Sequence, residues 1–375
     1  MGPAGMPELS QSPLAGVHRQ LGAQFAQFSG WSMPVSYTSV LAEHRAVRSG
    51  VGLFDVSHLG TCLVEGPGAA AYLNTRLAND LDRIAPGQAQ YTLLLNQSGG
   101  IVDDLIAYLF SPDRVMLIAN AANAAAVVAA LASSAPEALV WTRRPGTDAI
   151  LAVQGPASAQ VLAAAGLPTA MGYMSFAETV FTSGGSAVGL TVCRTGYTGE
   201  RGYEIVVPAG SATAVWHRLM QAGADWGIQP CGLGARDTLR TEMGYSLHGQ
   251  DISMATSPVE ARLGWAVGWK KASFDGAAAV RRQRREGVAR TWLGLRAVGR
   301  AIPRPGMTIL DEAGTAIGQV TSGTFSPTLG VGIGLGYVPA HTPAGTGVLV
   351  AVRGRREAFE VVKPPFVPSR VAGEE

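Results

Sequence analysis

The sequence between residues 60 and 77 reads Gly60-Thr-Cys-Leu-Val-Glu-Gly-Pro-Gly-Ala-Ala-Ala-Tyr-Leu-Asn-Thr-Arg-Leu77, and it contains a strand, a turn and a helix signature in succession. Residues 61–65 predict a strand, Gly-Pro-Gly a turn, and residues 69–77 a helix. These grouped elements and those downstream favour an α+β fold on an antiparallel sheet, rather than the strict alternation of a parallel one. The downstream elements are predicted strands at 91–96, 102–110 and 115–120 and an alanine-rich helix up to Ser133.

The same unit occurs again later, because Val64-Glu-Gly-Pro-Gly68 is matched by Val153-Gln-Gly-Pro-Ala157. Each Gly-Pro turn lies between a predicted strand and a predicted helix of small residues, which suggests two related halves. The second block is predicted to contain strands at 149–153, 178–182, 190–194 and 203–207 and helices at 157–165 and 211–226.

The N-terminal region predicts helices and a loop. Ser12-Pro13 favours a helix start, since Ser caps helices and Pro suits the first turn. Leu14, Val17 and Leu21 would share one face of that helix. A loop rich in glycine and aromatic residues is expected at 28–37, and a short helix at 40–49.

The last third of the chain has a different character. From about Thr291 the turn-forming residues follow one another closely and helical periodicity is almost absent. This pattern predicts a small β-barrel or jelly-roll.

Composition sets limits on the function. The 375 residues suffice for two to three domains of about 150 residues each. A net charge of +2 argues against a nucleic-acid-binding protein that depends on phosphate neutralisation. No apolar run reaches the roughly 20 residues of a membrane-spanning helix, and no secretory signal is recognisable, so a cytoplasmic protein is expected.

Cysteine and histidine spacing predicts neither disulfides nor metal. Cys62, Cys193 and Cys231 are far apart and form no Cys-x-x-Cys pair, so reduced thiols are expected. The six histidines show no metal-binding spacing.

Asp103 and Asp104 open a predicted strand and are the first candidates for chemistry. Because side chains alternate across a strand, the two carboxylates should face opposite sides and could not act as an acid/base pair. Asp104 and Tyr108 would share a face and could line a pocket. In the alternative reading, both aspartates only end the turn after Gly99-Gly100.

Two polar segments follow. Residues 194–204 are glycine-rich and lie between apolar strands, as a long hairpin or part of a site would. No Gly-Lys-Ser/Thr follows them, so they form no phosphate loop.

The second segment, Cys231-Gly-Leu-Gly-Ala-Arg236-Asp237, opens a predicted helix and superficially resembles a dinucleotide fingerprint. Asp237 replaces the third glycine and no strand is predicted directly before it, so no bound nucleotide is expected. Arg236 and Arg240 share a helix face, which makes sense if one of them turns inward to an acid or a ligand.

Seven segments, taken in order, carry a resemblance to a known family. They are Phe54-Asp-Val-Ser-His58, Gly99-Gly-Ile-Val-Asp-Asp-Leu105, Gln154-Gly-Pro156, Arg194-Thr-Gly-Tyr-Thr-Gly-Glu200, Gly232-Leu-Gly-Ala-Arg-Asp237, Ser257-Pro-Val-Glu260 and Thr321-Ser-Gly-Thr-Phe-Ser-Pro-Thr-Leu-Gly330. Together they resemble the aminomethyltransferase (T-protein) family of the glycine cleavage system, from about residue 12 to residue 368.

The resemblance implies an α+β fold with three domains in a cloverleaf: antiparallel sheets, a ferredoxin-like second domain and a C-terminal β-barrel or jelly-roll. The expected first domain is discontinuous, comprises residues 1–59 and 146–250, and would bind folate. The second would comprise residues 60–145 and 251–288, and the third residues 289–375.

The resemblance also implies a reaction. An aminomethyl group carried on the lipoyl arm of an H-protein would give its one-carbon unit to tetrahydrofolate, forming 5,10-methylenetetrahydrofolate and releasing ammonia. The expected partners are lipoylated H-protein and tetrahydrofolate, the latter as co-substrate. No metal, nucleotide, nucleic acid or membrane is implied.

Several site residues are implied by their match to the family's motifs. Asp104 is expected to be catalytic, near folate N10, where a carboxylate supports developing positive charge. Glu204 corresponds to an acid that binds the pterin, whose ring N–H and exocyclic amine suit a carboxylate. Arg236 would meet the acceptor side of the pterin or hold Glu204. Further lining positions are Tyr108, Tyr197, Tyr91, Asn120 and Tyr173.

The tail departs from the family's pattern. In Phe366-Val-Pro-Ser-Arg370 the arginine does not directly follow the aromatic residue, and Arg370 is the candidate for a C-terminal folate contact. The same fold also serves folate-dependent demethylases of small methylated amines or sulfonium compounds, and non-catalytic folate-binding modules. Both stay open as alternatives, because the shape of the pocket sets the specificity.

Overall fold

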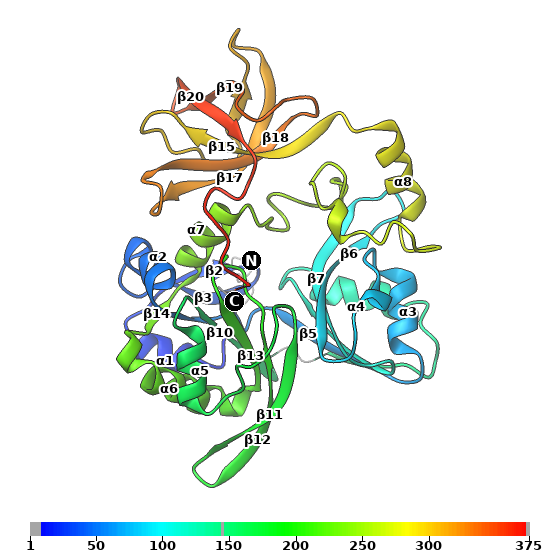
Figure 1. Ribbon diagram of the computed structural model, residues 1–375, viewed down its shortest axis with the longest axis vertical. Helices are drawn as coiled ribbons and strands as arrows, with labels where there is room; N and C mark the ends of the chain where they lie inside the picture. The colour runs from blue at the N-terminus through cyan, green and yellow to red at the C-terminus, as the bar shows by residue number, and fades with distance from the viewer. Residues whose placement is uncertain (1–8, 144–145, 373–375) are drawn as a thin grey trace, which may run out of the picture.

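The computed structural model of the protein describes residues 9–143 and 146–372. Three parts surround a common centre, two of them sheets with helices and the third a barrel (Figure 1). This is the predicted α+β cloverleaf. In the described ranges, no helix combines the length and the apolar character that crossing a bilayer would need.

The first part is built on a six-stranded sheet. Neighbouring strands are antiparallel except for the last pair. Helices α1 (Ala15–Gln20), α5 (Ser158–Ala165) and α6 (Ala212–Ala222) pack on one face, burying Leu14, Val161 and Trp216. In sheet order the strands are β11 (Phe176–Ser183), β12 (Ser186–Cys193), β13 (Gly202–Pro208), β10 (Asp148–Gln154), β4 (Gly52–Asp55) and β14 (Gln229–Cys231).

The second part is a five-stranded antiparallel sheet. Helices α3 (Ala69–Arg76) and α4 (Ala124–Ala132) cover one face, and Leu73 and Val127 join its core. A later segment with α8 (Ala277–Glu286) adds Val280 to a cluster with Leu93 and Ile101. In sheet order the strands are β6 (Gln88–Leu95), β7 (Ile101–Ser111), β8 (Arg114–Ala119), β5 (Gly60–Glu65) and β9 (Val140–Arg143).

The two sheets share a core. Ile150 and Val206 of the first sheet belong to the same buried cluster as Tyr108 and Met116 of the second. This packing brings strands β7 and β13, which carry Asp104 and Glu204, to the contact between the two parts.

The third part is a closed six-stranded barrel, the first of the two predicted alternatives. Its core contains Leu295, Val350 and Phe359. The barrel sits beyond α7 (Leu233–Met243), which packs against α2 (Val40–Ser49) (Figure 1). In barrel order the strands are β15 (Arg290–Ala297), β18 (Val331–Pro339), β17 (Ala316–Ser326), β16 (Thr308–Leu310), β19 (Gly347–Val352) and β20 (Arg355–Val362).

The repeated strand, turn and helix units have the same turn geometry. Gly66 and Gly155 occupy the same place in the two units, with φ of 134° and 131°. A Cβ there would lie 2.3 Å from the carbonyl oxygen of Ala138 and 2.4 Å from that of Gly50, respectively. Glycine is required at both positions because the turn is left-handed and closely packed.

Several predicted elements differ from the structure. Residues 28–37 were expected to form a loop, but β3 (Trp31–Ser36) pairs with β2 (Gln24–Phe28) and with β1 (Ser10–Gln11). Hydrogen bonding to the neighbouring strands satisfies the backbone N–H and C=O groups of residues 31–36, although the local composition there favours no regular structure. Leu21 does not join the buried face of α1, because the helix ends at Gln20, and it is 43% exposed.

The predicted helix over 211–226 is shorter in the structure, since α6 ends at Ala222 and a separate 3₁₀ turn covers Ala224–Trp226. The other 3₁₀ turns are Leu81–Arg83, Ala209–Ser211 and Gly264–Ala266. Each sheet takes its strands from one of the three expected domains, but the domain boundaries stay a prediction. The limits at residues 1, 145 and 375 lie outside the described residues.

Candidate functional site

Asp104 lies half-buried on β7. The hydroxyl of Tyr91, on the neighbouring strand β6, donates a hydrogen bond to its carboxylate at 2.9 Å. The side-chain amide of Asn120 donates another at 2.9 Å. Burial raises the pKa of Asp104, whereas these two hydrogen bonds lower it. A carboxylate held in this way is oriented before any ligand arrives.

Asp103 and Asp104 lie on different faces of β7, as the strand pattern predicted. The alternation is present, since Asp103 is fully buried and Asp104 only partly. However, the Nδ2 atom of Asn120 bonds Oδ1 of Asp103 and Oδ1 of Asp104, at 2.9 Å each. Asn120 directly follows β8 and reaches both carboxylates from the paired strand's end. Asn120 therefore links the two acids, although they lie on different faces of the strand as predicted.

Glu204 lies on β13 and is 7% exposed. The hydroxyl of Thr195 donates to its carboxylate at 2.5 Å, and the Tyr108 hydroxyl lies 3.4 Å from the Thr195 oxygen. Tyr108 has no exposed surface and packs edge-on against Phe176. The ring of Tyr108 belongs to the core next to Glu204, and its role in lining the folate site stays a prediction.

Arg236 extends from α7 over the ring of Tyr197, with 4.8 Å from the guanidinium carbon to the ring centre. Burial lowers the pKa of Arg236, while the charge of Glu204 opposes this shift. In the described part of the chain, the buried Nη1 of Arg236 has no hydrogen-bond partner. The guanidinium therefore keeps donor capacity free in the site, while Thr195 holds Glu204.

Arg240 is the member of the pair that turns inward to an acid, as the sequence suggested. It bonds Asp251 at 2.7 Å and Asp237 at 2.8 Å. Tyr197 lies next to this group, where burial raises its pKa, the charge of Asp104 raises it further, and Arg240 and Arg236 lower it. Asp104 and Arg236 thus act on the same ring from two parts of the molecule.

Two predicted residues lie further out. Tyr173 is 44% exposed, and burial and the charge of Glu204 raise its pKa. Arg370 points toward Glu200, with 3.9 Å between the nearest charged atoms, at the edge of a cavity of about 450 Å³. Arg48 and Thr328 also line that cavity, and Asp104 is not among its lining residues.

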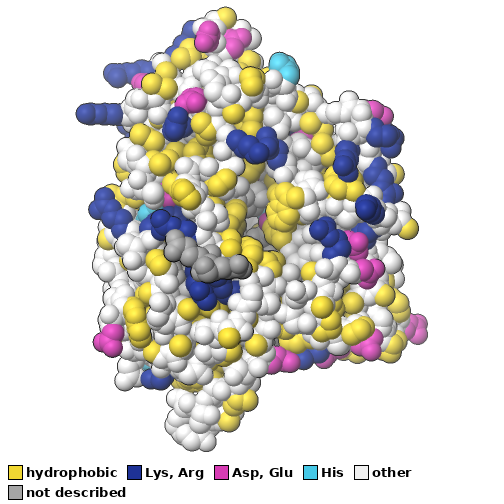
Figure 2. Space-filling view, viewed as in Figure 1, with side chains coloured by type: hydrophobic (Ala, Val, Ile, Leu, Met, Phe, Trp, Pro, Cys, Tyr) yellow, Lys and Arg dark blue, Asp and Glu magenta, His cyan; other side chains and the backbone are white. Residues whose placement is uncertain are grey.

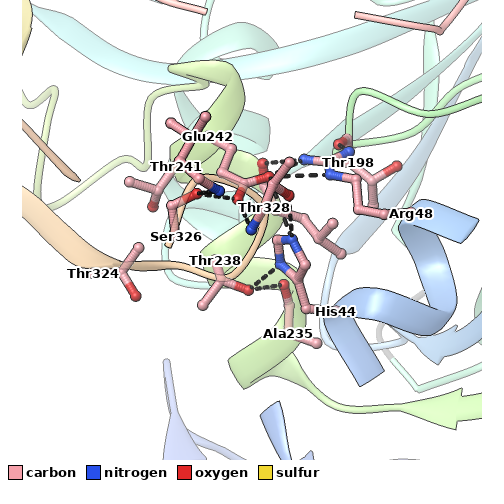
Figure 3. A network of polar contacts seen from close by, with 12 residues as sticks. His44, Arg48, Thr198, Ala235, Thr238, Thr241, Glu242, Thr324, Ser326 and Thr328 are labelled. Carbon is pink, nitrogen blue, oxygen red and sulfur yellow. Dashed lines mark hydrogen bonds and ion pairs between the residues drawn. The ribbon is translucent and has the colours of Figure 1, made fainter. Parts of the chain in front are cut away.

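A buried polar network between α2, α7 and the barrel shares His44, Arg48 and Thr328 with the lining of that cavity (Figure 3). Glu242 accepts hydrogen bonds from Arg48 at 2.8 Å and from Ser326 at 2.5 Å. His44 bonds Thr238 at 2.8 Å and Thr328 at 3.1 Å. Arg48 is therefore occupied by protein partners.

Sequence reasoning missed several residues at the centre. Trp265 is 62% exposed and stacks on Tyr91 with ring centres 5.1 Å apart. The backbone oxygen of Ser246 accepts from Tyr197, and Thr195 holds Glu204. No local signal separates such residues from ordinary surface or turn residues, although Thr195 lies inside a quoted motif. Figure 2 shows the surface hollowed where the three parts meet, with hydrophobic side chains along the edge.

The start of α7 corrects one argument against a nucleotide. Strand β14 does directly precede this helix, contrary to expectation. Yet the Gly232 amide already donates to Glu43 at 2.8 Å, and a Cβ on Gly232 would lie 2.2 Å from the backbone of Val35. This helix start is packed against protein, and the absence of a nucleotide stays a prediction. Among the described residues, no three His, Cys, Asp or Glu side chains are grouped as metal ligands would be.

Comparison with known proteins places these features in context. The family described as GCVT N-terminal domain matches residues 14–271, and the glycine cleavage T-protein C-terminal barrel domain matches residues 290–368. An aminomethyltransferase of Frankia alni is 56% identical over 97% of this chain and 99% of its own length. One of Mycobacterium tuberculosis is 54% identical over 96% and 98%. The crystal structure of glycine cleavage system aminomethyltransferase T from Bartonella henselae superposes with a TM-score of 0.89 at 39% identity, covering 96% of this chain and 99% of that one.

Proposed function

Since the chain belongs to the aminomethyltransferase (T-protein) family of the glycine cleavage system and transfers a one-carbon unit to tetrahydrofolate, we propose that Asp104 is its catalytic residue. The observation that carries the proposal is the half-buried carboxylate of Asp104, held by Tyr91 and Asn120. In the proposed reaction it orients folate N10 and supports the positive charge that develops there as the methylene group is transferred. Fixed charge in a partly dry site stabilises such a transition state by several kcal/mol.

Glu204 and Arg236 would bind the pterin ring. Glu204 is a buried carboxylate with a hydrogen bond from Thr195, and it can accept the paired donors of a pterin edge. Arg236 keeps a buried donor without a protein partner and is supported by the ring of Tyr197. Tyr91, Asn120, Tyr197 and Tyr173 would line the same site, with Arg370 as a candidate contact for the far end of folate.

The donor substrate in this proposal is the aminomethylated lipoyl arm of an H-protein. The products are 5,10-methylenetetrahydrofolate, ammonia and the dihydrolipoyl H-protein. The proposed reaction needs no metal and no nucleotide. The assay therefore contains a chelator, and neither metal nor nucleotide is added.

The test is turnover of the Asp104→Asn variant. Asparagine keeps the shape and loses the charge, so we expect turnover to fall by roughly a hundredfold or more while folate affinity changes little. Asp225→Asn, at an exposed position, is the matched control and should keep wild-type turnover. Comparable turnover of Asp104→Asn at equal folate saturation would remove Asp104 from the mechanism. Faster one-carbon transfer from dimethylglycine than from aminomethylated H-protein would favour a demethylase instead.

A further inference from the structure

Asp103 sits in the environment of an ionised carboxylate although it is fully buried. The backbone amide of Asn120 donates to it at 3.0 Å, and the Asn120 side chain at 2.9 Å. The side-chain amide of Asn123 donates at 2.7 Å. Three N–H donors stabilise the negative charge of a carboxylate. A protonated carboxyl group would instead point its own O–H hydrogen at N–H donors, with no acceptor to receive it.

The chain of hydrogen bonds continues to His248. The Asn123 Nδ2 atom also lies 2.9 Å from Nδ1 of His248, and Nε2 of His248 lies 3.0 Å from the carbonyl oxygen of Ile101. An amide nitrogen only donates, so Nδ1 accepts and Nε2 carries the hydrogen that goes to Ile101. Every donor in this chain has an acceptor, and the Asn123 amide is therefore held in one orientation.

The end of this chain is Asp104. The Nδ2 atom of Asn120 donates to both carboxylates. The hydrogen bond from Asn120 to Asp104 therefore depends on the bond that holds the same amide to Asp103. The two acids also interact through their charges: burial and the charge of Asp104 raise the pKa of Asp103 to about 7.

We propose that Asp103 is a positioning residue for Asp104, which fixes Asn120 against the Asp104 carboxylate. This inference rests on the proposed catalytic role of Asp104. Asp103 itself touches no ligand, because it has no exposed surface.

The titratable groups that face the two acids come from three segments. Tyr91 of β6 bonds Asp104, and Tyr197 of the 194–204 segment interacts with its charge. His248 is linked to Asp103 through Asn123, and a protonated His248 would lower the pKa of Asp104. Of the two acids, Asp103 is the one whose pKa the neighbouring charge raises, since the charge of Asp104 favours its protonated form.

The experiment is the pH profile of kcat/KM for the wild type and two variants. In Asp103→Asn the carboxylate that holds the Asn120 amide is replaced by an amide, so kcat should fall while the KM for tetrahydrofolate changes little. Any limb of the wild-type profile near pH 7 that reports the ionisation of Asp103 should disappear. In Asp103→Glu the charge is kept, so the limb should stay near its wild-type position while kcat falls, because the longer side chain displaces Asn120. Unchanged kcat in Asp103→Asn, or a kcat that falls together with a large rise in the KM for tetrahydrofolate, would leave Asp103 a structural residue and overturn the inference.

A second measurement does not need an Asp103 variant to fold. Carbon-13 NMR of labelled aspartate follows the Asp103 carboxyl in the wild type and in Asp104→Asn. We expect Asp103 to titrate at lower pH in the variant, because a like charge is removed. An unchanged titration of Asp103 would contradict the coupling. If instead Asp104→Asn keeps full turnover, the proposed role of Asp104 fails, while the NMR result still decides whether the two acids are coupled.

Discussion

Glu204 is the residue whose role in ligand binding is most open to a direct test. It is a nearly buried carboxylate, and Thr195 gives it a hydrogen bond that does not use its full acceptor capacity. A charge-assisted pair of hydrogen bonds to the pterin is worth on the order of 1.5–3 kcal/mol. Glu204→Gln should therefore raise the dissociation constant of tetrahydrofolate by roughly ten- to a hundredfold, measured by calorimetric titration.

The matched control is Glu178→Gln on β11 of the same sheet, where the side chain is 56% exposed and pairs with Arg114 at the surface. It should bind folate normally. A Glu204→Gln protein with normal affinity and a lowered melting temperature would show that Glu204 is scaffold rather than site.

At the scale of elements, the turn between β10 and α5 shows how the sheet is locked to its neighbours. Gly155 has φ of 131°, and a Cβ there would lie 2.4 Å from the Gly50 carbonyl oxygen and 2.7 Å from that of Val47. Both atoms belong to the end of α2, so a methyl group must push α2 away from the sheet. Gly155→Ala should lower the free energy of unfolding by roughly 1–3 kcal/mol, seen as a lower melting temperature.

Gly189→Ala provides the comparison, since Gly189 lies within β12 and a Cβ there meets no atom within 4 Å. We expect that variant to melt at or slightly above the wild-type temperature. Equal melting of the two variants would mean that the Gly155 turn does not constrain α2.

For the whole molecule, Glu242 is the central group of the junction between the first part and the barrel (Figure 3). Burial alone would raise the pKa of Glu242, but hydrogen bonds and charge from His44, Ser326 and Arg48 lower it from 4.5 to about 2. A lowered pKa stabilises the fold above pH 4.5, and this stabilisation is lost as the pH falls toward 2. Glu242→Gln should thus lower the melting temperature clearly at pH 7, with a difference from wild type that shrinks below pH 4.5.

The control for that pH series is Glu360→Gln, which removes an exposed pair with Arg296 on the barrel surface. Its melting temperature should follow the wild type at every pH, because exposed ion pairs contribute little. A Glu242→Gln difference that is as large at pH 3 as at pH 7 would contradict the assignment of the stabilisation to the ionised carboxylate.

The amino-acid sequence by itself determined much of this protein at the level of local pattern. The strand, Gly-Pro turn and helix of residues 60–77 and their repeat after Val153 predicted the α+β units, since hydrophobic periodicity and turn residues act over short distances. The spaced motifs carried the resemblance to a family that the comparisons then showed. Residues 28–37 were misread because a hairpin gains its stability from a partner strand, which local composition does not reveal.

Only the tertiary structure decided which side chains meet. Period-two alternation correctly put Asp103 and Asp104 on different faces of β7, but it could not show Asn120 reaching both of them from the end of β8. It put Tyr108 on the face of Asp104 without showing that a second sheet buries it completely. The physical reason is the same in each case: contacts between distant segments depend on how sheets pack, and packing is a property of the folded chain rather than of any stretch of it.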